Sequence, residues 1–251
     1  MGPNWPSETL NIFGAPDTGP ESPPPLTEEQ CEIARLPGTT RAIVLAGAGT
    51  GKTHVLAARL SDLIGSQGVG RGEVLVLSFS RAVVAELRKR LSAEGVLKGV
   101  YPATFDSFAT GMLASADPGG TWREQGYDER IVAATRLLRG SDVARSMVAD
   151  LAHVLIDEVQ DLVGVRAEFV MRLLEAAPGG FTLFGDPAQG IYGYRQADGG
   201  DVGGFCQIYD WIRRRFAGAL LVRRLTRNFR AVAPVTRSVL PFGDRLQASA
   251  P

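Results

Sequence analysis

The chain of 251 residues is poor in cysteine, histidine and long apolar runs. Its two cysteines, Cys31 and Cys206, lie far apart, which excludes a disulfide framework and a multi-cysteine zinc site. No apolar run approaches the roughly 20 residues that a helix needs to cross a bilayer. The N-terminal residues have neither the basic start nor the apolar core of a signal peptide. We therefore expect a cytoplasmic protein without a membrane partner.

Lysine is also scarce, since only three of the 27 basic residues are lysine and the other 24 are arginine. The formal net charge is zero, but the charge is unevenly spread. Residues 1–30 carry five acidic groups and no basic one, whereas residues 211–245 carry nine arginines and one acid, Asp244. A basic region of this kind suits phosphate groups. Arginine excess caused by GC-rich coding is the alternative explanation.

Proline is concentrated at one end, because seven of the 15 prolines fall within residues 1–25. Glycine and polar residues separate them, which is typical of a flexible tail. Thr27 is a good helix cap, and we expect a helix to run from there to residue 36, before Pro37 and Gly38.

Beyond this helix, expected strands and helices alternate along the chain. Short apolar segments predict strands at residues 41–46, 73–79, 153–156, 181–184 and 220–225, the last three buried. Helical periodicity predicts helices at residues 52–64 and 81–91. Strands separated by helices pair in parallel and are covered on both faces. The expected fold is therefore an α/β domain of three layers with a central parallel sheet.

One part of the chain departs from this alternation. Residues 124–150 predict two helices with no strand between them. We interpret residues 121–150 as a small helical insertion within a main domain of residues 26–226. His153, which lies on an apolar strand just after it, is expected to be a core histidine with satisfied hydrogen bonds.

The first expected strand is followed by a glycine-rich loop that opens a helix, Gly47-Ala48-Gly49-Thr50-Gly51-Lys52-Thr53. In a loop of this pattern the backbone amides turn inward and the helix N-terminus attracts anions. Lys52 adds a positive charge, and Thr53 is suited to bind Mg²⁺. The loop therefore predicts a binding site for the phosphates of a nucleotide, in preference to an ordinary glycine-rich turn.

An acidic pair follows the third expected strand. Asp157 at the carboxyl end of this strand is placed to hold Mg²⁺, and Glu158 is placed to orient and deprotonate an attacking water. An acidic pair in this position is often only a solvated turn. Downstream of a phosphate-binding loop, we interpret it as catalytic.

Six further segments extend this pattern from residue 26 to residue 230. They read LTEEQ at 26–30, SFS at 78–80, ATFDSF at 103–108, DEVQD at 157–161, GDPAQGIYGYR at 185–195 and LTRNFR at 225–230. In this order they resemble the Q motif, motif Ia, the TFHS segment and motifs II, III and IV of the UvrD/Rep/PcrA group of superfamily 1 DNA helicases. The resemblance implies a RecA-like P-loop NTPase domain that binds and hydrolyses ATP with Mg²⁺.

The resemblance also implies roles for residues around the nucleotide. Gln30 would read the adenine edge, and Phe229 would pack on the adenine ring. His54 would lie on the opposite face of that ring, unless it is simply a helix residue. Gln189 would sense the γ-phosphate, and Arg230 would contact it.

The same resemblance places single-stranded DNA on the chain. Phe79 and Tyr194 match the rings that stack on bases, and Thr104 belongs to the TFHS segment. Core packing of both aromatic rings is the alternative. Asp106 replaces the histidine of TFHS, and we expect this anion to repel a phosphate backbone.

Motifs V and VI, which carry the arginine finger in this family, do not occur after Arg230. We interpret residues 227–251 as motif IV and the start of a second domain that is missing. The expected activity is weak ATP hydrolysis coupled to single-stranded DNA, with a second chain or domain supplying motifs V and VI. The alternatives are a non-catalytic ATP-responsive switch that binds DNA or protein, and a truncated gene product.

Overall fold

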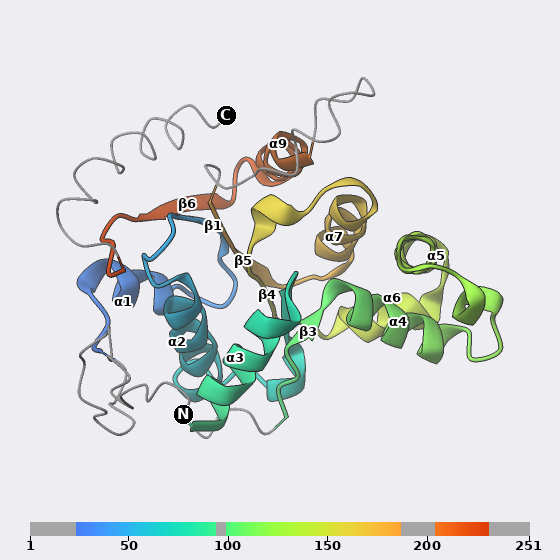
Figure 1. Ribbon diagram of the computed structural model, residues 1–251, viewed down its shortest axis with the longest axis horizontal. Coiled ribbons are helices and arrows are strands. Elements are labelled where there is room, and N and C mark those ends of the chain that lie inside the picture. Colours follow the sequence, from blue (N-terminus) through green and yellow to red (C-terminus); the bar gives the residue numbers. More distant parts are fainter. Residues whose placement is uncertain (1–23, 94–98, 187–203, 231–251) are drawn as a thin grey trace, which may run out of the picture.

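The computed structural model describes residues 24–93, 99–186 and 204–230, which surround a central parallel sheet (Figure 1). Its six strands lie in the order β3-β2-β4-β5-β1-β6, and all neighbouring strands are parallel. The strands are β1 (Arg41–Ala46), β2 (Val74–Ser78), β3 (Ala103–Thr104), β4 (His153–Ile156), β5 (Gly180–Gly185) and β6 (Leu220–Leu225). The expected α/β fold with a parallel sheet is confirmed.

Helices fill the connections between these strands, as parallel pairing requires. The α-helices are α1 (Glu28–Ala34), α2 (Lys52–Gly65), α3 (Arg81–Ala93), α4 (Phe105–Ala116), α5 (Tyr127–Gly140), α6 (Asp142–Ala149), α7 (Gly164–Ala176) and α9 (Gly204–Phe216). Short 3₁₀ turns are η1 (Arg71–Glu73), η2 (Thr121–Glu124) and η3 (Val159–Asp161). Within the described ranges, no helix is both long enough and apolar enough to cross a bilayer.

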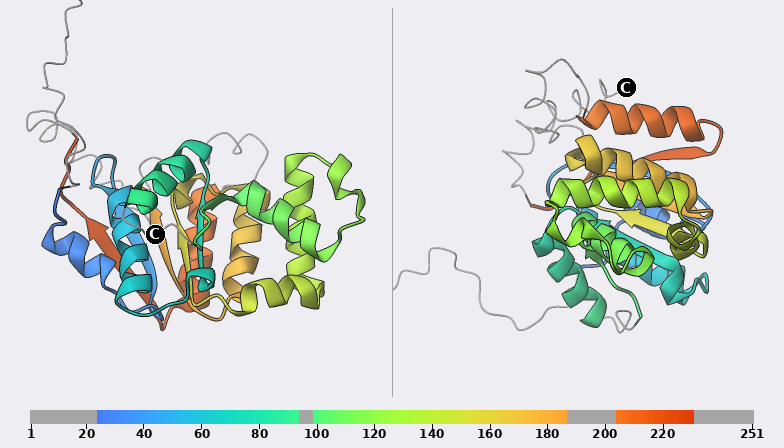
Figure 2. Two further views of the ribbon diagram at one scale, coloured as in Figure 1. Left: turned by 90° about the horizontal axis from the view of Figure 1, so that it is seen from below. Right: turned by 90° about the vertical axis from the view of Figure 1, so that its right-hand side faces the viewer.

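The two faces of the sheet bury different sets of helices, because successive strand residues point in opposite directions. Ile43 and Leu45 belong to a hydrophobic cluster with residues of α4, α5, α6, α7 and α9. Val44 and Ala46 belong to a second cluster with residues of α1, α2 and α3. The views in Figures 1 and 2 show the resulting three layers, which the sequence predicts.

The last strand differs from its prediction. Residues 220–225 were expected to be buried, but Val222, Arg223 and Arg224 of β6 are exposed. The reason is topological, since β6 lies at the edge of the sheet and has β1 as its only neighbouring strand. The exposed residues of this strand, including its two arginines, therefore reflect its edge position.

Helices α4, α5 and α6 form a lobe on one side of the sheet (Figures 1 and 2). Residues 121–150 contain η2, α5 and α6, with no strand between the two helices. Ile131 and Ala134 of α5 share a hydrophobic cluster with Phe169 of α7 and with the sheet. The lobe is thus built on the same core as the main layers.

A buried polar network lies at the amino end of β4. The Nδ1 atom of His153 lies 2.6 Å from the carbonyl oxygen of Gly38, and its Nε2 lies 3.0 Å from Thr182 Oγ1. Arg59 of α2 donates to Thr182 Oγ1 and to the Pro37 carbonyl. The expectation of a satisfied core histidine is confirmed. Burial, helped by the charge of Arg59, lowers the pKa of His153 to about 3.

Candidate functional site

The glycine-rich loop joins the carboxyl end of β1 to the first turn of α2. Gly49 and Gly51 have φ angles of 78° and 84°, which side chains rarely allow. Gly51 is also the N-cap of α2, and no side-chain hydrogen bond caps this helix. The amides of its first turn therefore open toward the loop, in the arrangement that binds anions in phosphate-binding loops.

Lys52 and Glu158 meet beside this loop although 106 positions separate them in the sequence. Lys52 Nζ donates to the Ala46 carbonyl oxygen at 3.3 Å and lies 3.6 Å from Glu158 Oε1. Lys52 begins α2 after the loop that follows β1, Glu158 follows β4, and β1 and β4 both flank β5. The parallel sheet thus brings the expected phosphate-binding lysine and the expected general base to one edge.

Asp157 has the properties of a buried cation ligand. It is 1% exposed, and its Oδ1 accepts a hydrogen bond from the Glu158 amide at 3.0 Å. Its Oδ2 is buried and has no hydrogen-bond partner in the described part of the chain. Burial and then the charge of Glu158 raise the pKa of Asp157 to about 7, although Lys52 opposes the shift. A cation beside this carboxylate would stabilise its ionised form.

The donor set around Asp157 fits Mg²⁺ bound to a nucleotide better than a metal held by protein alone. No group of three or more His, Cys, Asp or Glu residues that could hold a metal occurs among the described residues. Mg²⁺ commonly takes only one or two carboxylates and completes its shell with phosphates and water. Thr53, on the first turn of α2, is half-buried. Its role as a second ligand stays a prediction.

The backbone of Glu158 is strained. With φ 54° and ψ 47° it is left-handed, and it is the only non-glycine residue with positive φ in the ranges that the structure describes. Such conformations cost on the order of 1–3 kcal/mol and often occur at functional sites. The Glu158 Oε2 atom accepts a hydrogen bond from Gln160 Nε2. Both oxygens of Glu158 are therefore held, one by Gln160 and one near Lys52.

Gln30 connects α1 to the glycine-rich loop. As expected, Thr27 caps α1, and it forms a reciprocal capping box with Gln30. The Gln30 Nε2 atom also donates to the Thr50 carbonyl oxygen at 3.1 Å. A Cβ atom on Gly51 would lie 2.9 Å from that nitrogen. Gln30 thus packs directly against the loop, and its contact with adenine stays a prediction.

The segment after β6 covers the loop from the other side. Asn228 Nδ2 donates to the Ala48 carbonyl oxygen at 2.7 Å, and the Phe229 amide donates to the Gly49 carbonyl oxygen at 2.8 Å. A Cβ atom on Gly49 would lie only 2.7 Å from the Cβ of Arg230. The motif IV residues therefore lie against the loop in the folded chain.

Two residues expected around the adenine ring are placed separately. The Phe229 ring is half-exposed, with the Arg227 guanidinium 5.0 Å from its centroid. His54 lines a groove of about 430 Å³ together with Leu26 and Pro25, and its Nε2 has no hydrogen-bond partner in the described residues. Phe229 does not line this groove. The roles of both residues around adenine stay predictions.

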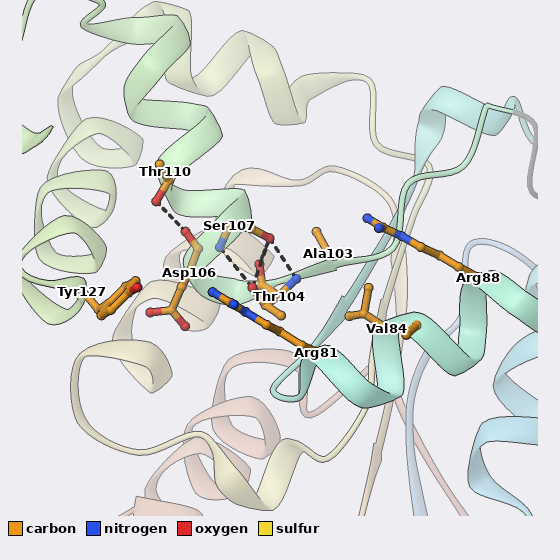
Figure 3. Close-up of a pocket in the computed structure, with 10 residues that line it drawn as sticks. Arg81, Val84, Arg88, Ala103, Thr104, Asp106, Ser107, Thr110 and Tyr127 are labelled. Carbon is orange, nitrogen blue, oxygen red and sulfur yellow. Dashed lines mark hydrogen bonds between the residues drawn. The ribbon is translucent and has the colours of Figure 1, made fainter.

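A second groove of about 710 Å³ lies between α3 and the start of α4 (Figure 3). Arg81 and Arg88 extend from α3 along one side, and Thr104 and Ser107 line the other. The Arg88 guanidinium donates to the Pro102 carbonyl at 2.9 Å, which holds it beside the groove. Tyr127, which is exposed, lies at the end nearest the helical lobe. The groove combines positive charge, hydroxyl groups and an aromatic ring.

The residues expected to contact DNA have different environments. Phe79 is 41% exposed, which excludes the alternative that it is a core aromatic. Thr104 caps α4, and its hydroxyl accepts from the Ser107 amide and donates to the Ser107 hydroxyl. DNA contacts of both residues stay predictions. Gln189 and Tyr194 lie outside the described residues.

Asp106 is not the unpaired anion that the sequence suggests. Arg166 of α7 binds its carboxylate at 2.7 Å and 3.4 Å through Nη2 and Nε. A third nitrogen of Arg166, Nη1, lies 2.8 Å from Asp128. The expected repulsion of phosphates by Asp106 is therefore reduced only in part, because Arg166 is shared between the carboxylates of Asp106 and Asp128.

Several residues of the site were missed by the sequence analysis. Gln160 lies inside the quoted DEVQD segment, so the sequence could have indicated it as a site residue. Its contacts with Glu158 and Asp186 could not have been predicted. Glu29 accepts from the Thr226 amide at 3.1 Å with either carboxylate oxygen. Glu29 and Asn228 also lie inside quoted segments, 26–30 and 225–230, but their partners lie far away in the sequence. For Arg166 no local pattern indicates a role.

Among solved structures, this chain is similar to a Pif1 helicase from a study of DNA unwinding at forked double-stranded DNA. The superposition covers 87% of this chain and 48% of the Pif1 chain. The TM-score is 0.49 and the sequence identity 16%. Bacteroides Pif1 bound to single-stranded DNA overlays 87% of this chain and 46% of its own, with a TM-score of 0.47 and 19% identity.

Two curated relatives come from Mycobacterium tuberculosis. The chain is 37% identical to the ATP-dependent DNA helicase UvrD1 over 142 residues, which cover 50% of this chain and 18% of the relative. It is 33% identical to UvrD2 over 132 residues, which cover 48% of this chain and 17% of the relative. The chain therefore matches less than a fifth of the length of these relatives.

The family comparison covers more of the chain. The UvrD/REP helicase N-terminal domain matches residues 26–125 and 120–205, which include the glycine-rich loop, the acidic pair and the whole segment 185–195. Because this match extends over well more than half of the chain, the resemblance is confirmed at the level of the family. The protein belongs to the UvrD/REP helicases and contains their N-terminal domain.

Proposed function

We propose that this chain binds ATP with Mg²⁺ and hydrolyses the ATP, as the nucleotide-binding part of a DNA helicase. The observation that carries the proposal is the meeting of Lys52, Asp157 and Glu158 beside the glycine-rich loop. A buried acid with an unpartnered oxygen, a lysine and open helix amides are together suited to a nucleotide and its cation. The relatives named as DNA helicases support this assignment.

In this proposal the loop amides and Lys52 bind the phosphates. Glu158 accepts a proton from the attacking water as that water approaches the γ-phosphorus. Thr53 and Asp157 would hold Mg²⁺, which supplies charge neutralisation on the phosphate oxygens when bound. Gln30, His54 and Phe229 would contact the base, and Gln189 and Arg230 the γ-phosphate.

We also propose that single-stranded DNA lies in the groove between α3 and α4. Arg81 and Arg88 line the groove and offer charge to the backbone. Phe79, which precedes α3 and is not among the lining residues, offers an exposed ring for stacking. Thr104 and Tyr194 would complete this path. A second domain or chain carrying motifs V and VI would supply an arginine to the phosphates, which typically adds about 10³-fold or more to the rate.

Calorimetry with ATP and Mg²⁺ tests the nucleotide site. Replacement Lys52→Ala should reduce ATP affinity at least tenfold, because the charge beside the loop is lost. The matched control is Lys89→Ala, which removes an exposed lysine of α3. Equal ATP affinity of the Lys52→Ala protein and the unmodified protein would refute the assignment.

ATP hydrolysis with and without single-stranded DNA tests the catalytic part. We expect turnover that DNA stimulates and that Glu158→Gln lowers by about 100-fold or more, leaving a measurable residual rate. Tight ATP binding without any turnover would indicate the ATP-responsive switch instead.

A further inference from the structure

The side chain of Gln160 links two segments of the site. It is 2% exposed and lies in η3, directly after β4. Its Nε2 donates to Glu158 Oε2, and its Oε1 accepts from the Asp186 amide at 3.0 Å. Asp186 follows β5, so one buried amide joins the chain segments that leave two neighbouring strands.

Gln160 makes one of the two contacts that hold the Glu158 carboxylate. The other contact is the ion pair between Glu158 Oε1 and Lys52 Nζ, at 3.6 Å. If Lys52 turns toward phosphate, Oε1 is released and Oε2 stays bound to Gln160. Gln160 therefore determines which oxygen of Glu158 faces a reacting water.

Close packing keeps this link in place. A Cβ atom on Gly185 would lie 2.5 Å from Val159 Cγ1 and 3.0 Å from Gln160 Oε1. The absence of a side chain at Gly185 lets the end of β5 approach η3 closely enough for the Asp186 amide to reach Gln160. The strained backbone of Glu158 lies at the other end of the same link.

We propose that Gln160 is a positioning residue that holds Glu158 for proton transfer and ties it to the backbone after β5. The inference rests on the proposed ATP hydrolysis. In the step itself, water oxygen bonds to the γ-phosphorus, the bond from that phosphorus to the ADP oxygen breaks, and a water proton passes to Glu158 Oε1. The amide of Gln160 neither gains nor loses a proton.

The first test compares turnover with ATP binding in the full chain with saturating single-stranded DNA. Replacement Gln160→Leu should lower kcat at least tenfold and leave the KM and the calorimetric affinity for ATP within about twofold. The matched control is Gln67→Leu, which removes an amide that bridges two segments at the far end of α2.

The second test is a double-mutant cycle, which separates positioning from a general structural role. If Gln160 acts through Glu158, then Gln160→Leu should cause less than a twofold further loss in a Glu158→Gln background. Equal fold-losses in both backgrounds would overturn the inference. If the unmodified chain turns over ATP and Gln160→Leu has no effect on kcat, the inference about Gln160 is overturned and the proposed function stands. If the unmodified chain neither binds nor hydrolyses ATP, the proposed function is overturned together with the inference.

Discussion

The nucleotide side of the molecule and the groove between α3 and α4 are built in different ways. Around the glycine-rich loop, buried or half-buried groups from α1, β1, β4 and the segment after β6 bind one another through specific hydrogen bonds. In the groove, Arg81 and Arg88 are exposed, and the hydroxyl groups mainly cap a helix. Close packing therefore defines the nucleotide side, and exposed charge defines the groove between α3 and α4.

This difference predicts how each region responds to change. A site defined by close packing should lose function when an atom is added. A groove defined by exposed charge should tolerate changes of shape and weaken as ionic strength rises.

The largest expected effect is that of Gly49→Ala on ATP binding. The new Cβ would lie 2.7 Å from Arg230 Cβ in a backbone with φ 78°, so the loop must move. Strain of about 1–2 kcal/mol and misplaced loop amides should together reduce ATP affinity on the order of 100-fold. Calorimetry would measure this loss. The control is Gly68→Ala, which has φ 71° but open space around it and should leave ATP affinity unchanged. Unchanged affinity in both variants would contradict a site defined by packing.

Acid should lower the free energy of unfolding through His153, which lies at the amino end of β4. Its pKa is about 3 in the folded chain and about 6.5 when exposed, so the unfolded state binds the proton first as pH falls. The contribution of neutral His153 to the free energy of unfolding is complete above about pH 6.5. It decreases by about 1.4 kcal/mol for each pH unit toward pH 3, so about 2.7 kcal/mol is lost at pH 4.5. Urea unfolding at several pH values would measure it. The variant His153→Gln should show a correspondingly shallower pH dependence, and an identical slope would exclude His153 as its source.

In the groove, replacing Arg81 and Arg88 together with alanine should weaken binding of single-stranded DNA about tenfold at low salt. The slope of log affinity against log salt should fall by about 1.4, or about 0.7 for each lost phosphate contact. Fluorescence anisotropy at several salt concentrations would measure both values. The matched control replaces Arg213 and Arg214, which are exposed on α9. Comparable losses in the two double variants would show that binding does not depend on this groove.

The smallest expected effect comes from Asp106→Asn. Removing one negative charge from the end of the groove should raise affinity for single-stranded DNA about two- to threefold at low salt, since the pair with Arg166 is partly exposed. The control Asp142→Asn removes an acid that pairs with Arg145 on α6. A decrease in affinity would instead mean that Asp106 orients Arg166 for DNA.

The sequence predicts the fold well because strands β1, β2, β4 and β5 are buried apolar segments and the loops carry strong signals. Thr27 caps its helix, and the glycine pattern of residues 47–51 opens α2, as expected. Both features depend on residues close together in the chain. The exposure of β6 was missed, because edge position depends on the order of strands and not on any local pattern.

For the candidate site, too, the sequence predicts what local patterns determine and misses what the packing of distant segments determines. Lys52, Asp157 and Glu158 were identified by spacing and meet as expected at one edge of the sheet. The pairing of Asp106 with Arg166 joins positions 60 residues apart, so the charge that Asp106 presents could not be judged from its neighbours in sequence. Contacts between distant segments are set by packing, which motif spacing does not contain.

The hydrogen bond from Asn228 to the Ala48 carbonyl has a consequence for the direction of the loop amides. A trans peptide is planar, with its C=O and N–H groups pointing in opposite directions. Holding the Ala48 carbonyl toward Asn228 therefore turns the Gly49 amide hydrogen away from it. A loop whose peptide planes are oriented before an anion arrives loses little conformational entropy on binding. For such a loop, charge and hydrogen bonds would determine the free energy of nucleotide binding, because ordering the backbone would cost little.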